Sequence, residues 1–396
     1  MSMFVKPINE IEFEDVKIFC NEQIEENRRL EYKKAFSSKD EKKQIAKEIS
    51  AFANTHGGVI LVGVNEKDRK PKLPIEGIDY EKGFNEKVIS IALKNIYPPV
   101  FPETKVCRFG NNLEKAVVVI RVQESDETPH TVERTTGVYV RVDSQNEPQR
   151  APFEEIEWLM NRRKKAVENR ERLLRRAEER FHNQPTRKDF KAFQCISVIP
   201  VFPHAPLVAL KDLSETIKES RSVYTSDFPP RDSYKTAHES IVYETQYNEY
   251  TKDSGLLDYT EINQFGLIFS KQSLLRDDMK KKIDLFETSK LLKDVLKYSL
   301  KFYEKVGYFG LILINLSLKE IIGWTLTTSE RLSYSERPTG SPNIDNIISF
   351  ERKVTVYELS ERFDEIVKDV FNELLWSFGV DNDHQRKGLI DKIYKK

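Results

Sequence analysis

The sequence predicts an α+β protein with an N-terminal α/β domain, a long charged linker helix and a second α+β domain. Residues 30–64 show a strand–helix–strand pattern, a strongly charged helical stretch follows later, and the polar segment His182–Arg187 then separates two halves of different pattern. We therefore expect domains at residues 1–160 and 188–396, joined by a basic helix at residues 161–187.

Composition limits how such a protein could bind other molecules. Lys and Arg number 64, and Asp and Glu also number 64, so the formal net charge at pH 7 is zero. A nucleic-acid site would therefore have to be a local basic patch. The chain has an odd number of cysteines, and they lie far apart in the sequence, at Cys20, Cys107 and Cys195. This pattern predicts reduced thiols in a cytoplasmic protein.

No targeting or membrane segment is expected. The N-terminus lacks the charged and then apolar pattern of a signal peptide. The most apolar stretch, Gly307–Leu318, is too short to span a bilayer and is typical of a buried strand.

The strand–helix–strand pattern of residues 30–64 begins and ends with a predicted strand. Leu30–Lys33 alternates apolar and polar residues, which predicts a strand with Glu31 and Lys33 on one face. Val59–Val64 is a continuous apolar run, the pattern of a strand covered on both faces. Asn65–Asp68 then reads as a polar exit turn.

A helix is predicted between these strands. Gly57 and Gly58 should end it, because glycine accepts the left-handed conformation that often follows a helix. The unit would bring three carboxylates, Glu26, Glu31 and Glu66, toward one of its ends. The apolar residues of the helix recur at helical spacing, at Ile45, Ile49, Phe52 and Ala53.

Further elements are predicted along both halves. Helices are expected at Ile8–Gln23, Phe84–Ile96, Pro152–Phe181, Ser273–Gly307 and Arg362–Phe378. Strands are expected at Lys105–Phe109, Ala116–Val122, Gly137–Val142, Ser240–Tyr250, Gly266–Ser270 and Tyr308–Leu316. Short apolar runs interrupted by prolines lie at Gln194–Phe202 and Pro206–Ala209.

Several short motifs carry a resemblance to a known family. They are Leu30-Glu31-Tyr32-Lys33, the run Ile49–Thr55, Gly57-Gly58, Val62-Gly63-Val64 and Gly137–Arg141. Together they resemble the Alba-like domain of the Schlafen family, over roughly Ile8–Arg163. The Ser-Ala-Phe-Ala-Asn-Thr-x-Gly-Gly run followed by an apolar strand is the most specific part.

The resemblance implies a metal-dependent nuclease site. Schlafen nucleases use three acidic residues, and the matching positions here are Glu26, Glu31 and Glu66, which would hold Mg²⁺ or Mn²⁺. Glu25 is an alternative to Glu26. The family nucleases usually carry Asp at the third position, where this chain has Asn65-Glu66, so the metal geometry there is open. Lys33 matches a basic residue that could bind the scissile phosphate.

The function implied by this resemblance is an endoribonuclease for structured RNA, with tRNA as the expected substrate, in stress or phage defence. Two alternatives stay open: a nucleic-acid-binding regulator without catalysis, and a nucleotide-binding protein. Animal Schlafen nuclease regions join two Alba-like lobes, whereas this chain carries the motifs once. We therefore expect a homodimer, or a larger assembly built from dimers.

The basic helix has two interpretations. Residues 161–180 contain nine Lys or Arg and four Glu. They could form a solvated linker with ion pairs such as Glu168–Arg172 and Glu171–Arg175, or a stripe that binds RNA phosphates. The candidate phosphate-binding residues are Arg162, Arg163, Lys164, Lys165, Arg172, Arg175 and Arg176.

Separate expectations apply to five other residues. Arg141 could bind phosphate, or it could pair with Glu31 or Asp143. His56 is expected to be a helix-end cation, and His130 is expected at the surface. The face formed by Tyr243 and Tyr247 could stack on bases, although core packing is the commoner role of such a stripe.

Overall fold

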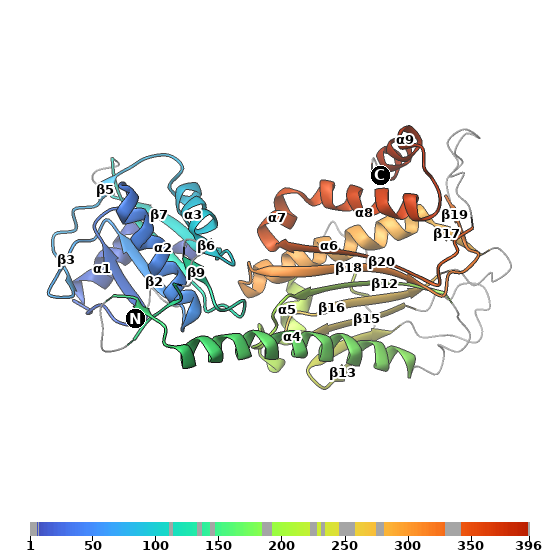
Figure 1. Cartoon of the computed structure of the whole chain (residues 1–396), viewed down its shortest axis with the longest axis horizontal. Coiled ribbons are helices and arrows are strands. Elements are labelled where there is room, and N and C mark those ends of the chain that lie inside the picture. The colour runs from blue at the N-terminus through green and yellow to red at the C-terminus, as the bar shows by residue number, and fades with distance from the viewer. Residues whose placement is uncertain are drawn as a thin grey trace. The chain divides into compact units, whose positions relative to one another are not determined.

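The computed structural model describes residues 6, 8–110, 114–132, 137–142, 147–183, 192–221, 228–230, 234–244, 258–274, 281–328 and 342–394. Asp143, Tyr247 and residues 184–187 of the expected boundary lie outside these ranges. The chain forms two compact units, Met1–Lys165 and Ala166–Lys396. Their boundary falls inside the basic helix, and the whole is a mixed α+β structure as predicted (Figure 1).

A small mixed sheet forms the centre of the first unit. Strand β1 (Leu30–Lys33) pairs in parallel with β2 (Gly58–Val62), so β1–α2–β2 is a crossover unit. Antiparallel β8 (Lys115–Val122) lies on the other side of β2 and also pairs with β7 (Glu103–Arg108) and β5 (Ile78–Asp79). The predicted pairing of the two strands before and after Gly110 is therefore confirmed.

Helix α2 (Lys39–Asn54) begins and ends where its sequence signals place it. Ser38 and Glu41 form a reciprocal capping box at its start. At its other end Gly57 adopts a φ of +67°, and its N–H donates to the carbonyl of Phe52. A Cβ at Gly57 would lie 2.6 Å from the Val122 carbonyl oxygen, so the position requires glycine.

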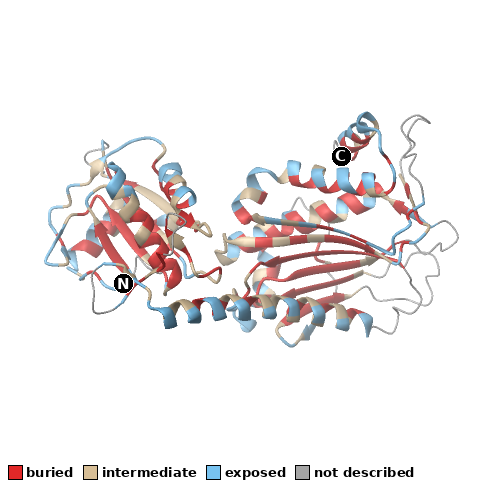
Figure 2. Ribbon diagram, viewed as in Figure 1, coloured by how far each residue is buried: buried red, intermediate tan, exposed pale blue. Residues whose placement is uncertain are grey.

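Helices cover both faces of this sheet. Helix α1 (Phe13–Asn21) packs on one face against Leu30 and Tyr32, and α2 and α3 (Phe84–Asn95) pack on the other against Ile60 and Val62. The strands are therefore buried on both sides, as the apolar run after Gly58 predicted (Figure 2). The single helix expected at Ile8–Gln23 is divided, because Glu12 caps α1 and a short 3₁₀ turn, Ile8–Glu10, precedes it.

Three two-stranded ladders complete the first unit. The expected exit turn after Asn65 is a hairpin of β3 (Glu66–Lys67) and β4 (Lys70–Pro71). The strand expected at Gly137–Val142 is shorter than predicted, because only β10 (Tyr139–Val140) pairs with β11 (Gln149–Arg150). The third ladder joins β6 (Ile96–Tyr97) and β9 (Thr131–Val132).

An antiparallel sheet organises the second unit. Its strand order is β13-β14-β15-β16-β12-β18-β20. These strands are β13 (Tyr234–Ala237), β14 (Ser240–Glu244), β15 (Asp258–Asn263), β16 (Ile268–Ser273), β12 (Phe193–Pro200), β18 (Leu311–Lys319) and β20 (Ile347–Thr355). The apolar stretch at Gly307–Leu318 contains most of β18, which lies between β12 and β20, so the predicted strand is confirmed.

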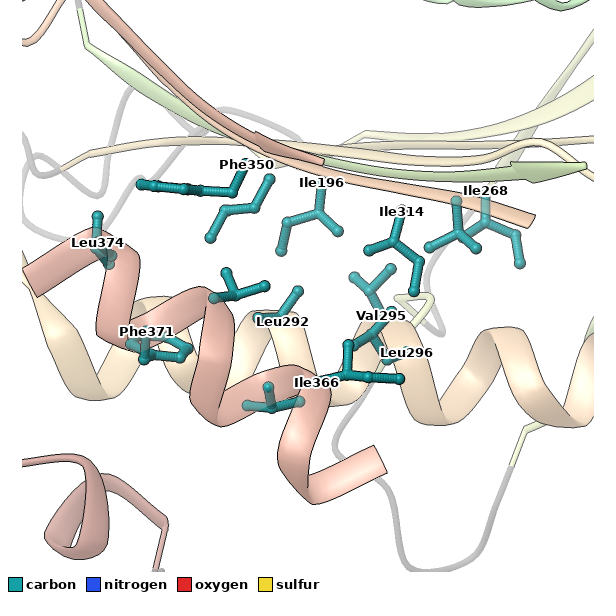
Figure 3. Close-up of a cluster of buried hydrophobic side chains, with 14 of the residues drawn as sticks. Ile196, Ile268, Leu292, Val295, Leu296, Ile314, Phe350, Ile366, Phe371 and Leu374 are labelled. Carbon is teal, nitrogen blue, oxygen red and sulfur yellow. The ribbon is translucent and has the colours of Figure 1, made fainter. Parts of the chain in front are cut away.

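One face of this sheet packs on helices α6 (Leu285–Val306) and α8 (Phe363–Ser377), as Figure 3 shows for Ile196, Ile268 and Ile314 above Leu292 and Leu374. The predicted helix at Ser273–Gly307 starts later, because Ser273 ends β16 and Asp284 caps α6. The remaining described elements are α5 (Leu210–Glu219), α7 (Val356–Glu361), α9 (Asp383–Tyr394) and the parallel pair β17 (Lys282–Asp284) and β19 (Thr325–Thr327).

The other face is covered by helix α4 (Phe153–His182). Leu173, Ala177 and Phe181 of α4 pack against Phe193 and Tyr259 of the sheet. Tyr243 is also buried in the core of this unit, so its ring is not exposed for stacking on bases.

Two expectations about the chain's environment can be compared with this fold. The three cysteines are free and buried, so none of them forms a disulfide. Among the described helices, none is both long enough and apolar enough to cross a bilayer.

Candidate active site in the first unit

Strand β1 lies at the edge of its sheet and presents two charged side chains toward α2. Glu31 pairs in register with Ile60, and Lys33 with Val62, both of which belong to the core on the α2 side. Because strand residues two apart share a face, Glu31 and Lys33 point the same way, as predicted. Their side chains form an ion pair, and Glu31 is buried.

A third charged residue, Glu48 of α2, meets this pair and was missed by the sequence reasoning. Its side chain is fully buried, with 0% exposed. One oxygen, Oε1, lies 3.5 Å from Lys33 Nζ and accepts a hydrogen bond from Gln44. The other, Oε2, accepts from Arg141 at 2.8 Å.

Arg141 closes the arrangement from the segment that follows β10. Its Nη1 donates to Glu31 at 3.0 Å as well as to Glu48, and its Nη2 donates to the Asn27 carbonyl at 2.9 Å. Its guanidinium also lies over the ring of Phe52, 5.1 Å from the centroid. Of the two interpretations of Arg141, the structure therefore shows the pairing with Glu31.

The Ala-Asn-Thr motif explains how Arg141 reaches this place. The Asn54 side chain donates to the carbonyls of His130 and Tyr139 and accepts from the His130 N–H at 2.8 Å. Ser50 donates to the same His130 carbonyl. This buried network fixes two loop segments against α2, and Arg141 lies two residues after Tyr139.

His130 itself corrects a prediction. It was expected at the surface, but it is only 1% exposed, because these hydrogen bonds hold its backbone against α2. Its ring Nδ1 is 2.7 Å from the Pro98 carbonyl oxygen, so Nδ1 carries the proton and donates. Burial lowers the pKa of His130 to about 4. His56, by contrast, is exposed beyond the end of α2, 3.8 Å from Glu124.

Glu26 lies just before β1 and is held by backbone contacts. Its Oε1 accepts from the Tyr32 N–H at 2.9 Å, and its own N–H donates to the Arg69 carbonyl. Burial, together with the neighbouring Glu31 charge, raises the pKa of Glu26 to about 7. We call Glu26, Glu31, Lys33, Glu48 and Arg141 the charged cluster.

Glu66 lies at the margin of this cluster. It is exposed in β3, and its Oε2 accepts from the Arg69 N–H at 2.9 Å, while the Arg69 side chain donates to the Glu26 carbonyl. Arg69 therefore connects the segments that carry Glu66 and Glu26. Within the described ranges, no set of three or more His, Cys, Asp or Glu residues is arranged to hold a metal ion.

The charged cluster holds three carboxylates and two cations, which leaves an excess of negative charge when all are ionised. Burial opposes the charged form of Lys33, but Glu48 and Glu31 outweigh it and raise the pKa of this ammonium. Burial also raises the pKa of Glu48, an effect that Glu31 adds to and that Lys33 and Arg141 oppose. The cluster can thus accept a further cation or a proton.

The basic helix divides its cations between protein contacts and solvent. Arg162 is buried and pairs with Asp126 at 2.9 Å and Glu124 at 2.8 Å. Lys164 and Lys165 are exposed. Arg163 is partly buried and has interactions with neighbouring groups.

Further along α4, arginines fasten the helix to the second sheet. Arg172 and Arg176 both pair with Glu239, at 3.0 Å and 2.9 Å, and Arg180 pairs with Glu261. Arg175 is exposed between them. Only part of the predicted phosphate-binding stripe therefore faces solvent.

Comparison with known proteins gives the family of the first unit. Residues 26–150 match the family model described as Schlafen, AlbA_2. The predicted resemblance is thereby confirmed, and the chain contains an N-terminal Schlafen AlbA_2 domain. A search of curated proteins gave no match.

Two solved structures are similar to this chain. One is the DIP2311 protein from Corynebacterium diphtheriae, at 14% identity and a TM-score of 0.28, covering 44% of this chain and 35% of that one. The other is the N-terminal domain of an ATP-dependent DNA helicase RecG-related protein from Nitrosomonas europaea, at 23% identity and a TM-score of 0.26. It covers 35% of this chain and 92% of that domain.

Proposed function

We propose that this protein is a metal-dependent endoribonuclease that cleaves structured RNA, with tRNA as the expected substrate, in stress or phage defence. Its Schlafen AlbA_2 domain indicates a function connected with nucleic acids. The observation that supports catalysis is the charged cluster, in which Glu26 and Glu31 lie beside a lysine whose ammonium stays charged. A protein that only binds RNA has no need of buried carboxylates beside the phosphate path, because they repel it.

The carboxylates suit Mg²⁺ or Mn²⁺ by their chemistry. Mg²⁺ prefers oxygen ligands, keeps several waters and often needs only one or two carboxylates. Glu26 accepts its hydrogen bond through Oε1, which leaves Oε2 for a metal, and the excess negative charge favours a divalent cation. Glu26 and Glu31 would hold the ion, and Glu66 would become a third ligand only after a rearrangement, since the described residues form no ready group of three ligands. A bound ion would polarise a phosphoryl oxygen.

The other members of the cluster would serve the same reaction. Lys33, which pairs with Glu31 and Glu48, would bind the phosphate and stabilise the charge that develops on it. Arg141 and Glu48 are buried and each contacts other members of the cluster, so their role would be to position Glu31 and Lys33. To contact a phosphate, Arg141 would have to give up its hydrogen bonds to Glu31 and Glu48.

The test is cleavage of tRNA with Mn²⁺ or Mg²⁺, with and without EDTA. Glu26→Gln, Glu31→Gln and Glu66→Gln should each lower cleavage by roughly 100-fold or more, because each removes a charge needed in the transition state. Glu86→Gln, at an exposed position on α3, is the matched control. Wild-type cleavage by any one of the three variants would remove that residue from the site.

The alternative is a nucleic-acid-binding regulator without catalysis, or a nucleotide-binding protein. Wild-type protein that binds RNA and leaves every tRNA intact would favour it. The proposal also includes a homodimer, because two AlbA_2 domains would offer folded RNA a wider surface. Light scattering during size exclusion tests this, and a mass near 46.3 kDa with and without RNA would exclude the dimer.

A further inference from the structure

A cavity of about 400 Å³ opens in the first unit next to the end of β1, which Lys34 directly follows. The segments that follow the parallel strands β1 and β2 line it, through Lys34–Ser37 and through Gly63 and Asn65. In sheets with parallel strands, ligands characteristically bind outside the carboxyl ends of those strands. The volume lies within the range of small-molecule and nucleotide sites.

The cavity is physically continuous with the strand that carries the candidate catalytic residues. Lys34 directly follows Lys33, and the Gly63 N–H donates to the Lys33 carbonyl at 2.8 Å. Gly77, which also lines the cavity, donates in turn to the Gly63 carbonyl at 3.0 Å. A group bound in the cavity would therefore lie near the end of β1, the strand that carries Glu31 and Lys33.

Each carboxylate that lines the cavity already has a lysine partner. Glu76 pairs with Lys72, Asp79 with Lys115, and Glu81 with Lys87. These pairs are exposed and each is close to electrically neutral.

Two further lining lysines, Lys34 and Lys42, remain as positive charges. Both are exposed, and within the described part of the chain neither forms a hydrogen bond or an ion pair through its ammonium group. The hydrogen bond and charge of Lys72 lower the pKa of Glu76, and the charge of Lys34 adds to this effect. The cavity thus carries a local positive charge although the chain as a whole carries none.

Part of the cavity lining is apolar. Phe36 and Phe84 both line it, with ring centroids 5.5 Å apart in an edge-to-face arrangement. Helix α3 starts at Phe84 and has no side-chain cap, so its first N–H groups add to the positive potential. A cavity lined by both aromatic rings and lysines suits a ligand that combines a flat or sugar-like body with an anion.

We propose that this cavity binds a phosphate together with its nucleotide, and that the nucleotide belongs to the RNA strand held at the charged cluster. Lys34 and Lys42 contact the phosphate, and the nucleoside packs toward Phe36 and Phe84. This assignment rests on the proposed function, because it takes the cluster to hold the neighbouring phosphate. The second source of the same chemistry is a free nucleotide, which the experiment separates.

The experiment measures binding, in EDTA so that no metal-dependent cleavage occurs. Anisotropy of a labelled single-stranded RNA is recorded at several salt concentrations for wild type and for Lys34→Gln/Lys42→Gln. The control is Lys94→Gln/Lys290→Gln, which removes two charges at exposed positions that do not line the cavity. Losing two phosphate contacts should weaken binding severalfold and flatten the salt slope by about 1.4. Titration with ATP, followed by calorimetry, forms the second arm.

The outcomes separate the possibilities. A flatter slope in the cavity variant alone supports the assignment. An equal change in both double variants, an unchanged slope, or no RNA binding by wild type overturns it. ATP binding that is lost in the cavity variant while the RNA slope is unchanged assigns the cavity to a free nucleotide and overturns the RNA source. RNA binding through the cavity without any cleavage in Mn²⁺ contradicts the proposed nuclease alone.

Discussion

Replacing Arg141 by methionine should destabilise the first unit strongly. Methionine has a similar length and can still cover the Phe52 ring, so the main change is the loss of the guanidinium. The Arg141 side chain is 1% exposed, and its two partners Glu31 and Glu48 are 3% and 0% exposed. The variant would therefore leave two buried carboxylates with only Lys33 between them.

The size of the effect follows from this geometry. Two unit charges about 3 Å apart attract by roughly 5 kcal/mol at an effective dielectric constant of about 20. Desolvation of the ions cancels much of that gain, but removing one partner of a buried pair typically costs about 3–5 kcal/mol. Because every 1.4 kcal/mol is about tenfold, protection of core amides should fall by roughly 100-fold or more.

Native-state hydrogen exchange is the suitable assay, because it reports the opening free energy of β2 and β8 without assuming that both units unfold together. Arg150→Met, at an exposed position in the neighbouring β11, is the matched control. The double variant Arg141→Met/Glu48→Gln should recover part of the loss, because it removes one of the stranded charges. Unchanged protection in Arg141→Met, or no recovery in the double variant, would refute the paired geometry of the cluster.

Two further results are expected. The pKa of His130 is lowered to about 4 from an ordinary 6.5, so between these values the unfolded chain binds a proton that the folded chain does not. The free energy of unfolding should therefore decrease as the pH is lowered from 6.5 to 4, by at most about 1.4 kcal/mol per pH unit, and this decrease should be smaller in His130→Gln. Glu239→Gln removes the common partner of Arg172 and Arg176. The opening free energy of the second half of α4 should therefore fall by about 1 kcal/mol, and its amides should exchange faster than in the control Glu179→Gln. Equal exchange in the two variants would contradict docking of α4 through Glu239.

Local periodicity was sufficient to predict the β1–α2–β2 unit. Alternation placed Glu31 and Lys33 on one face, and apolar spacing with Gly57 placed α2 and its end. Both features depend on neighbours within one or two turns, so the sequence contains all the information they need. The same holds for α4, whose charged pattern gave its extent to within a residue at each end.

Glu48 shows what the sequence reasoning left unused. It lies three residues after Ile45 and four before Phe52, so helical spacing places it on the buried stripe. A glutamate on a buried stripe needs a cationic partner, which could have directed attention to Arg141. The partner itself could not be named, because it lies 93 residues away and reaches the site through the Asn54 network.

The second sheet was harder to predict for a physical reason. All eight residues of β12 are buried, since helices cover both faces of the sheet, and such a strand shows no alternation. Strands β15 and β16 contain polar residues that are nevertheless buried, such as Glu261 and Lys271. Their partners, Arg180 and Glu178, belong to α4, so their polarity is understandable only once that helix is placed.

The placement of α4 also divides its cations into two groups, those that pair with the protein and those that face solvent. Both interpretations of the basic helix assumed that all the Lys and Arg side chains of the helix have the same surroundings. When one face of a helix packs against a sheet, some of its side chains contact the protein and the others face solvent. Arg172 and Arg176 are four residues apart and meet the same carboxylate, while Arg175 is rotated toward solvent. Any contribution of α4 to RNA binding should therefore come from its exposed cations, Lys164, Lys165 and Arg175, and the paired arginines serve chiefly to hold the helix on its sheet.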